Sequence, residues 1–524
     1  MSAPKLLAII ICLLLTTHAS YAQTTTPNLD NTFRVRLLAD PLTFDWSTAH
    51  TEMETPIISN IMEGLYQFDS ELRLRPALAS GYELKADQKT YIFKIRPGIV
   101  WSDGKPLRAQ DFIFSWTRLL EPSTASAYAY LLFGVEGAKN FNGRKGDKSQ
   151  LGLRVIDDLT FEVKLEKPVS YFLQLTAVWP LYPMREDVIH RHGSQWTRVG
   201  RIVTLGPYRL KEHVPNAQII LERNDTYHGQ RPKIAFIEFR IINEDSTALR
   251  LFENGQVDLL RPINFLELGK LEQSPNFHKQ SYLRVCYLNF NTSKFPFNLP
   301  KFRQAISHAI DKSQIVKALH RDIEPAHAFV PTNLLKPTFV QPFSLPKALE
   351  LMKDTGLETS TLGKIDLNVY SSDENTLLAQ ALQSQLKKHL NLNIEINMQE
   401  YKLYRTHLEL KMGSMYMRCW KGDYPDADSF LEIFTSHSGT NRTNWKNSEY
   451  DQLIETASAT LNQKERIPLY NKAQELLLKD HAVIVPLYNE SASYLLNSRI
   501  KDFKMNSINF FDLRRTTITP TEKK

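Results

Sequence analysis

Strand-like and helix-like patterns alternate along most of this 524-residue chain. Runs rich in β-branched and aromatic residues predict strands, for example TYIFKIRPG, TFEVKLEKP, QIILERN and IAFIEFRII. Between these runs the apolar residues recur every three or four positions, which is typical of amphipathic helices. This alternation predicts a mixed α/β fold, and a chain of this length is expected to form about two or three domains.

The helix signals are clearest in the second half of the chain. The segment LPKFRQAISHAIDKSQIVKALHR has Pro300 in its first turn and predicts one amphipathic helix packed on a sheet. Its apolar face consists of Phe302, Ile306, Ala309, Ile310, Val316 and Leu319. A second helix is predicted from Ser448, with Asp451 as a capping-box partner. A third is predicted over about 463–478, and AVIVPLY after it predicts a buried strand.

The first residues, MSAPKLLAIIICLLLTTHASYA, have the pattern of a secretory signal peptide. Lys5 precedes an apolar run over 6–15, and Ser20 and Ala22 form an A-x-A-like site, so we expect cleavage after Ala22. A retained anchor is the less favoured alternative, because the run is too short to span a bilayer. Cys12 follows three isoleucines, unlike a lipid-attachment cysteine. We therefore expect the mature protein to be free in an exported compartment.

The charge of the chain is modest. Removing residues 1–22 takes away Lys5 and no acid, which lowers the formal net charge from +7 to +6. No basic block or basic stripe interleaved with aromatic residues is present, so nucleic acid is not an expected partner. Cys286 and Cys419 remain after cleavage. In an oxidising compartment they could pair or stay as buried free thiols, and composition leaves both alternatives open.

Catalytic and metal-binding motifs are missing from the sequence. It contains no H-E-x-x-H, G-x-S-x-G, G-x-x-x-x-G-K-[ST] or C-x-x-C pattern. Its 14 histidines are scattered, and His190 and His192 favour a solvated loop over a metal site because no ligand cluster accompanies them. We therefore expect a binding protein with no cofactor and no metal. The aromatic residues, 10% of the chain, suit either a core or the walls of a ligand cavity.

Several long motifs carry a resemblance to a known family. The stretch RPGIVWSDGKPLRAQDFIFSWTRLLEPSTASAYAYLL resembles a segment of the extracellular solute-binding proteins of family 5, which serve ABC importers. Four further segments resemble other motifs of that family in the same order: GPYRLKEHVPNAQIILERNDTYH, ALRLFENGQVDLL, YLNFNTSKFPFNLPKFRQAISHAIDK and GDYPDADSFLEIFTSHSGTNRTNW. These motifs are more similar to the oligopeptide-binding branch than to the nickel or dipeptide branches.

The resemblance implies a periplasmic-binding-protein-like fold, with two α/β lobes joined by a two-segment hinge and an additional domain inserted into the first lobe. After a signal peptide over 1–22, lobe I would comprise residues 23–63, 193–282 and 500–524. The inserted domain would comprise 64–192, and lobe II 283–499. An extended peptide would bind in the cleft between the lobes.

The resemblance also implies which residues bind the ligand. In the W-x-x-D-Y pattern Trp420 would line a side-chain pocket and Asp423 would be the partner of the peptide's α-amine. Cys419 would lie on the strand that pairs with the peptide, and Tyr128 and Tyr401 are weaker pocket candidates. The alternative for Asp423 is a turn-forming residue before Tyr-Pro.

The rest of this stretch is assigned to local structure. We expect Asp426 to form a turn and Asp428 to cap a helix that starts at FLEIF. Upstream, Arg418 and Lys411 are out of register with the residues that hold a peptide's C-terminus in relatives, which leaves that contact and the peptide length open. Both cysteines are offset by two positions from those of relatives, in opposite directions, so the resemblance implies a disulfide between Cys286 and Cys419.

The leading expectation is a monomeric periplasmic protein that delivers oligopeptides to the permease subunits of an ABC transporter in the inner membrane. One alternative is a murein-peptide binding protein, and another is a periplasmic chaperone or receptor without import. A peptidase is disfavoured because the sequence contains no catalytic motif.

Overall fold

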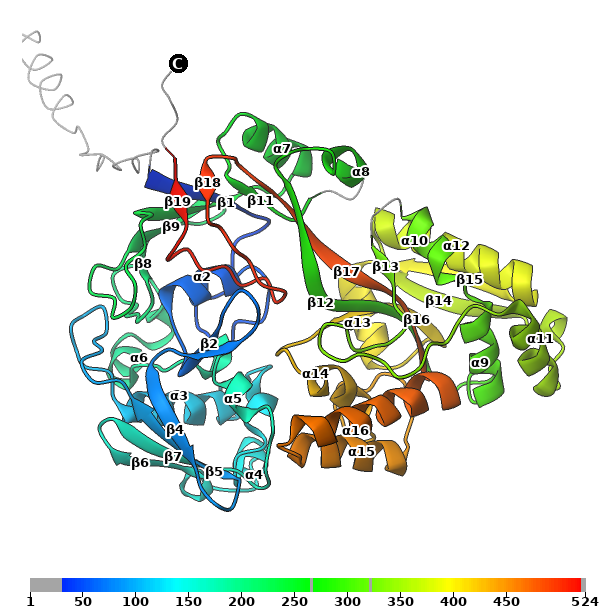
Figure 1. The fold of residues 1–524 in the computed structure, drawn as a ribbon, viewed down its shortest axis with the longest axis horizontal. Coiled ribbons are helices and arrows are strands. Elements are labelled where there is room, and N and C mark those ends of the chain that lie inside the picture. Colours follow the sequence, from blue (N-terminus) through cyan, green and yellow to red (C-terminus); the bar gives the residue numbers. More distant parts are fainter. Residues whose placement is uncertain (1–30, 264–266, 320–322, 520–524) are drawn as a thin grey trace, which may run out of the picture.

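Two bodies joined by two long strands make up the computed structural model, which describes residues 31–263, 267–319 and 323–519 (Figure 1). The strands β12 (Phe277–Phe290) and β17 (Ile484–Leu496) pass from one body to the other and pair antiparallel. Their register shifts between Ser281 and Val285, in the middle of the ladder. Because such an irregularity bends a ladder locally, the two strands form the connection expected of a hinge. The predicted signal peptide lies outside the described residues.

A large mixed sheet runs through both bodies, with the strand order β15-β14-β16-β12-β17-β11-β1-β10-β9-β8 and with β13 paired to β17. In the first body its strands are β1 (Thr32–Leu37), β8 (Tyr208–Val214), β9 (Gln218–Arg223), β10 (Phe236–Ile241) and β11 (Leu259–Leu260). In the second they are β13 (Glu324–Pro325), β14 (Lys364–Tyr370), β15 (Asn393–Gln399) and β16 (Met415–Lys421). The prediction of a mixed α/β, two-lobe fold is confirmed.

A separate four-stranded sheet lies between β1 and β8 in the sequence, in the order β4-β5-β7-β6. Its strands are β4 (Ala79–Leu84), β5 (Thr90–Ile95), β6 (Leu153–Asp157) and β7 (Thr160–Lys164), and β2 (Tyr66–Phe68) pairs with β3 (Leu74–Pro76) nearby. The accompanying helices are α2 (Thr55–Ile61), α3 (Ala109–Leu120), α4 (Ala138–Asn142), α5 (Phe172–Leu175) and α6 (Glu186–His192). The position of this sheet fits an insertion, and the domain boundaries stay a prediction.

The remaining elements cover the large sheet. In the first body these are α7 (Asp245–Glu253), α8 (Leu268–Leu271) and the small pair β18 (Ile500–Lys501) and β19 (Thr517–Ile518). In the second they are α9 (Pro300–Ala309), α10 (Lys312–Ala318), α11 (Leu345–Asp354), α12 (Asp373–Leu390), α13 (Tyr401–Glu409), α14 (Asp428–Leu431), α15 (Ser448–Ala459) and α16 (Gln463–Glu475). Among the described residues, no helix combines the length and apolarity needed to cross a membrane.

The helix predicted after Pro300 is divided into two, which corrects the sequence-based expectation. α9 ends at Ala309, and the carboxylate of Asp311 accepts hydrogen bonds from the backbone N–H groups of Ser313 and Gln314 to start α10. The apolar face continues across this break, because Ile310 and Val316 are both buried. Hydrophobic spacing alone therefore could not reveal that a capping aspartate separates the two helices.

The other two predicted helices and the predicted strand are present, but their ends differ from the prediction. α15 begins at Ser448, but Asn447 caps it, and Asp451 accepts a hydrogen bond from the backbone N–H of Ser436 instead. α16 ends at Glu475 and continues as a π-helical turn over Leu476–Asp480. The predicted strand AVIVPLY supplies the start of β17.

Candidate ligand-binding site

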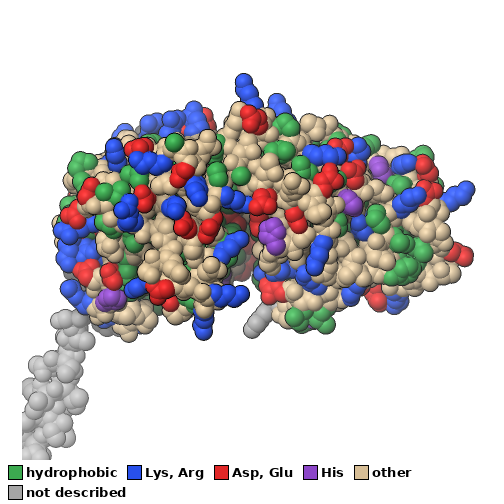
Figure 2. All heavy atoms as spheres, turned by 90° about the horizontal axis from the view of Figure 1, so that it is seen from below, with side chains coloured by type: hydrophobic (Ala, Val, Ile, Leu, Met, Phe, Trp, Pro, Cys, Tyr) green, Lys and Arg blue, Asp and Glu red, His purple; other side chains and the backbone are tan. Residues whose placement is uncertain are grey.

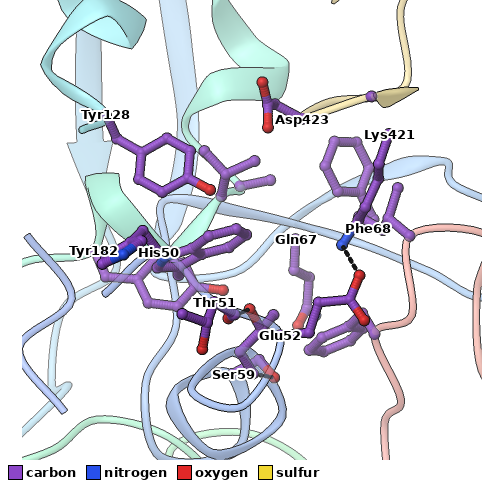
Figure 3. Close-up of a pocket in the computed structure, with 17 residues that line it drawn as sticks. His50, Thr51, Glu52, Ser59, Gln67, Phe68, Tyr128, Tyr182, Lys421 and Asp423 are labelled. Carbon is purple, nitrogen blue, oxygen red and sulfur yellow. Dashed lines mark hydrogen bonds and ion pairs between the residues drawn. The ribbon is translucent and has the colours of Figure 1, made fainter. Parts of the chain in front are cut away.

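Two cavities lie between the lobes, and Asp423 lines both of them. The small cavity, about 230 Å³, has a mainly apolar wall (Figure 3). Its lining includes His50, Glu52, Phe68, Tyr128, Trp179 and Lys421. The large cavity, about 740 Å³, lies between the inserted segment and the second lobe, and its lining includes Tyr130, Tyr171, Trp420 and Glu432. Seen from below, the surface is hollowed between the two halves (Figure 2).

The Asp423 carboxylate is held where the two cavities meet. Its Oδ2 accepts a hydrogen bond of 2.5 Å from the Tyr130 hydroxyl, and its backbone N–H donates to Oγ of Ser429 at 2.8 Å. Burial raises the pKa of this carboxyl, while the Tyr130 hydrogen bond and the charge of Lys421 act in the opposite direction. Among the residues that the structure describes, Asp423 forms no ion pair. The site therefore contains a partly buried acid that lacks a bonded cation.

The strand leading to Asp423 has one open edge. The backbone N–H of Gly422 donates to the carbonyl of Leu283 on β12 at 2.9 Å. Because backbone groups of alternate residues face opposite sides in an antiparallel ladder, those of Cys419 and Lys421 point away from β12. On that side β14 pairs β16 only at Met415 and Tyr416. The edge beside Cys419 and Lys421 is thus uncovered by any described strand and could pair with an extended chain.

Trp420 is fixed as part of the cavity wall. Its indole N–H donates to the carbonyl of Ser429 at 2.8 Å, and its ring lines the large cavity. This hydrogen bond holds the ring beside the same short segment that binds the backbone of Asp423. Trp420 and Asp423 thus line the same large cavity, and their roles in ligand binding stay predictions.

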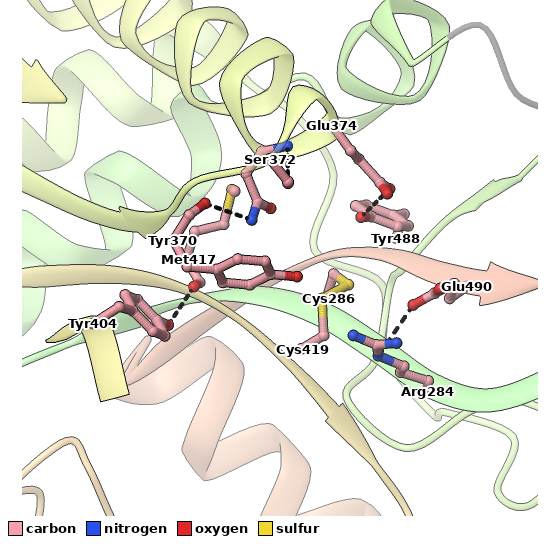
Figure 4. The surroundings of a disulfide bond; sticks show 11 residues. Arg284, Cys286, Tyr370, Ser372, Glu374, Tyr404, Met417, Cys419, Tyr488 and Glu490 are labelled. Carbon is pink, nitrogen blue, oxygen red and sulfur yellow. Dashed lines mark hydrogen bonds and ion pairs between the residues drawn. A yellow bond between two sulfur atoms is a disulfide. The ribbon is translucent and has the colours of Figure 1, made fainter. Parts of the chain in front are cut away.

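Cys419 and Cys286 are directly opposite each other on β16 and β12 and are joined by a disulfide (Figure 4). Their Cα atoms are 3.9 Å apart, at a pair of residues that does not exchange backbone hydrogen bonds, where strands approach most closely. Among the described acids, Glu490 lies near both sulfurs, and its carboxylate forms an ion pair with Arg284 at 3.1 Å. Because both sulfurs are in the disulfide, this group offers no thiolate to a metal.

Of the two tyrosines predicted to line side-chain pockets, one lines a cavity and the other does not. Tyr128 lines the small cavity, and its ring packs edge-on against Trp179. Tyr401 lies at the start of α13 with its side chain largely exposed and its ring against Tyr370. It lines neither of the two cavities. Tyr130, two residues after Tyr128, makes the contact with Asp423 that sequence reasoning missed, although both tyrosines lie in the same ASAYAYLL motif.

Asp426 forms the expected turn, because its carboxylate accepts the backbone N–H of Asp428 at 3.0 Å, but Asp428 does not cap a helix. Asp426 is buried and forms two hydrogen bonds with the guanidinium of Arg466, at 2.7 and 3.0 Å. Asp428 is also buried and accepts hydrogen bonds from the hydroxyls of Tyr424 and Tyr470. The N-cap position of α14 belongs to Ala427. Both acids are bound by side chains from α16, 40 or more residues away, which local turn and cap rules could not reveal.

A second acid lines the small cavity from the first lobe. Glu52 lies 3.8 Å from Nζ of Lys421 and accepts a hydrogen bond of 2.9 Å from the Tyr282 hydroxyl (Figure 3). Burial would raise the pKa of Glu52, but the charge of Lys421 and the Tyr282 hydrogen bond lower it on balance. This ion pair joins the two lobes beside Asp423, and it leaves Lys421 less able to neutralise that acid.

Direct contacts close the large cavity from the outside. The backbone N–H of Ser170 donates to the carbonyl of Ser458 at 2.9 Å, and Lys167 pairs with Glu455. Each contact joins the inserted segment to α15 of the second lobe. A ligand in the large cavity would therefore be enclosed between the lobes.

Two arginines lie at the other end of the open strand edge. Arg418 is five residues before Asp423, stacks over the ring of Tyr287 and donates to Asn289 at 3.5 Å. Burial, and then the neighbouring charge of Arg418, lowers the pKa of Arg442. Neither guanidinium forms an ion pair among the described residues, and the buried hydroxyl of Tyr287 has no hydrogen-bond partner. Neither arginine lines either cavity, but along the open strand edge an acid lies at Asp423 and a base at Arg418.

Comparison with known proteins identifies the family. The model of the bacterial extracellular solute-binding proteins, family 5, matches residues 73–442. The chain belongs to this family. Among curated family 5 relatives, the periplasmic oligopeptide-binding protein OppA of Salmonella typhimurium is 32% identical, with 85% of this chain and 84% of the relative covered. The dipeptide-binding protein DppE of Bacillus subtilis is 29% identical, covering 91% and 90%.

A solved structure of family 5 shares the fold over almost the whole chain. The murein tripeptide-binding protein MppA of Escherichia coli superimposes with a TM-score of 0.80 at 27% identity, with 93% of this chain and 98% of the other covered. Each of these three proteins matches this chain over 84% or more of its own length. The resemblance inferred from the ordered motifs is confirmed.

Proposed function

We propose that this protein captures an oligopeptide in extended form between its lobes and delivers it to an ABC transporter permease. The peptide's α-amine would pair with Asp423, and its backbone would pair with the open edge at Cys419 and Lys421. The C-terminal carboxylate would point towards Arg418 and Arg442. Trp420 and Tyr128 would line side-chain pockets. In this arrangement main-chain contacts supply affinity for many sequences.

The observation that carries this proposal is Asp423, a partly buried acid without an ion pair among the described residues, at the end of an open strand edge. A buried carboxylate without a cation costs several kcal/mol, and its hydrogen bond from Tyr130 compensates only in part. An ammonium group brought by the ligand would neutralise it. A peptide also has the backbone donors and acceptors that the strand edge requires.

The distance between the charged ends suggests a peptide length. Five residue steps along an extended strand, from Arg418 to Asp423, span about 17 Å. An extended peptide of about four or five residues has this separation between its amine and its carboxylate. Shorter peptides could reach Arg418 only through an intervening water.

The same proposal includes the setting of the protein. Relatives with periplasmic names support export after cleavage at Ala22, and we propose a monomer that binds the membrane permease in its closed form. Binding is the whole activity, without a catalytic step. We also retain the division into lobe I, an inserted domain over 64–192 and lobe II.

A murein-derived peptide is the second candidate ligand. Two observations favour it: the structural likeness to MppA, and Arg418 and Lys411, which are out of register with the carboxylate-binding residues of oligopeptide-binding relatives. Such a ligand also has an amine for Asp423. It differs from an ordinary peptide at its carboxylate end.

Mass spectrometry of co-purified ligands tests the proposal. The protein would be purified without refolding and denatured, and the small molecules released would be identified. Peptides of about two to five residues are expected, and a diaminopimelate-containing peptide would favour the murein candidate. Long unfolded segments would instead indicate a chaperone. A preparation that releases no peptide and binds none in calorimetry would refute peptide capture.

A further inference from the structure

The large cavity contains more acid than its own cations can neutralise. Its lining carboxylates are Glu166, Asp423, Asp428, Glu432, Asp451 and Glu455. Its lining bases are Lys139, Lys167 and His437. A cavity of about 740 Å³ between two lobes is large enough for a long side chain. Charge balance in this enclosed space therefore points to a ligand that brings positive charge.

Three of these acids are already used by the protein. Glu455 pairs with Lys167, Asp451 accepts from the backbone N–H of Ser436, and Glu166 accepts from that of Gly137. These contacts hold loops and close the lobes. They leave Asp423, Asp428 and Glu432 as the acids that face the cavity.

Those three acids have hydroxyl partners and no bonded cation among the described residues. Asp423 is bonded to Tyr130, and Asp428 is bonded to Tyr424 and Tyr470. Glu432 has a hydrogen bond from Ser438 alone. Burial raises the pKa of Asp428 to about 7, so Asp423 and Glu432 are the acids whose charge these hydroxyls leave uncompensated. One ligand ammonium at Asp423 would still leave Glu432 without a bonded cation.

Glu432 is the acid best placed to meet a second cation. It follows α14 directly, in the turn Glu432–Phe434, and shares the cavity with Trp420 and Tyr171. Burial, with the nearby charge of Asp423, raises the pKa of Glu432, while His437, Ser438 and the charge of Lys139 act in the opposite direction. Aromatic walls suit the alkyl part of a lysine or arginine, and a ring face attracts its charged end.

We propose that the large cavity receives a cationic side chain of the ligand, lysine or arginine, with Glu432 as its counter-charge. This inference rests on the proposed peptide-binding function and names its preferred substrate class. Adjacent side chains of an extended peptide point to opposite faces, and Asp423 borders both cavities. Only one of the first two peptide side chains should therefore enter the large cavity, and a cationic side chain should be preferred at that position alone.

Calorimetry with the mature protein and matched tetrapeptides tests this inference. The peptides are Lys-Ala-Ala-Ala and Ala-Lys-Ala-Ala, each compared with a norleucine twin that keeps the chain length and removes the charge. At one position lysine should bind about tenfold tighter than norleucine. Equal affinities at both positions would overturn the inference while leaving peptide binding intact. If no peptide of the set binds, the proposed function fails and this inference fails with it.

Variants assign the preference to one residue. Glu432→Gln should abolish the tenfold lysine preference, so that the lysine and norleucine peptides bind this variant with equal affinity. Glu449→Gln, an exposed acid on the same lobe that lines neither cavity, should keep the preference. A preference that survives Glu432→Gln would exclude Glu432 as the counter-charge. The wild-type comparison does not depend on how either variant folds.

Discussion

The hydroxyl of Tyr130 donates a hydrogen bond of 2.5 Å to Oδ2 of Asp423, joining residues that are 293 positions apart in the chain. Tyr130 belongs to the inserted segment and Asp423 to the second lobe, so this bond crosses the cleft. It orients the carboxylate without neutralising it, because burial raises the pKa of Tyr130 far above its ordinary value and keeps the phenol neutral. A ligand amine would meet a carboxylate that is already positioned.

Replacing Asp423 with Asn should weaken binding of peptides with a free amine much more than binding of N-acetylated peptides. The variant keeps the size and the acceptor but removes the charge. A lost charge-assisted hydrogen bond reduces affinity by on the order of 10- to 100-fold. Calorimetry with one tetrapeptide in its free and acetylated forms measures the difference.

A surface aspartate provides the control for this prediction. Asp158→Asn changes an acid that is 75% exposed in the inserted segment and should leave both affinities unchanged. Equal losses for the free and acetylated peptides in Asp423→Asn would show that Asp423 does not bind the amine.

Arg418→Met should remove the distinction between a free and an amidated peptide C-terminus. In the wild-type protein the free carboxylate should bind about tenfold tighter than the amide, because the guanidinium groups of Arg418 and Arg442 form no ion pair with any described residue. The variant should reduce this ratio towards one. Arg405→Met is the matched control, since Arg405 is half-exposed and already paired with Glu409. An unchanged ratio in Arg418→Met would place the carboxylate elsewhere.

Removing the disulfide should destabilise the protein. Cys286 and Cys419 enclose a sequence separation of 133 residues, so their bond restricts the unfolded chain strongly. Replacing both with Ser should lower the free energy of unfolding by about 2–4 kcal/mol, measured by urea denaturation. Reduced wild-type protein should behave like the double variant. Two reactive thiols in denatured, unreduced mature protein would show that the bond does not form.

The sequence predicts those features of the fold and site that depend on local patterns or on a contiguous motif. The α/β alternation and the presence of Trp420 and Asp423 at one cavity are of this kind. Contacts between distant segments are not, and the cross-lobe pair Glu52 and Lys421 depends on how two lobes pack. The break between α9 and α10 could be predicted only in part. Asp311 is a good N-cap residue, but the continuous apolar face outweighs that signal when the sequence is read alone.

The ion pair between Asp426 and Arg466 should be essential for stability. Both side chains are about 90% buried and form two parallel hydrogen bonds. Asp426→Asn or Arg466→Met alone leaves one charge buried without its partner and should cost about 3–5 kcal/mol in urea unfolding. The double variant should lose less than the sum of the two single variants. Additive losses would mean that the two residues stabilise the fold independently.

The stability contributed by Asp428 should fall as the pH rises. Burial, and then the charges of Asp426 and Glu432, raises the pKa of Asp428 from 3.8 to about 7, against hydrogen bonds from Tyr424 and Tyr470. Between about pH 4 and 7 the folded protein therefore holds a proton that the unfolded chain has released. Raising the pH through this window removes up to about 1.4 kcal/mol of stability per pH unit.

Asp428→Asn separates this effect from the other titrating groups. The amide stays neutral at every pH, so wild type should lose stability relative to the variant from pH 4 to 7, with little further change above pH 8. Urea unfolding of both proteins at intervals of half a pH unit measures the difference, and its slope should vanish outside the window. Parallel curves for the two proteins across the whole range would contradict the prediction, because they would mean that Asp428 is already ionised at pH 4 in the folded state.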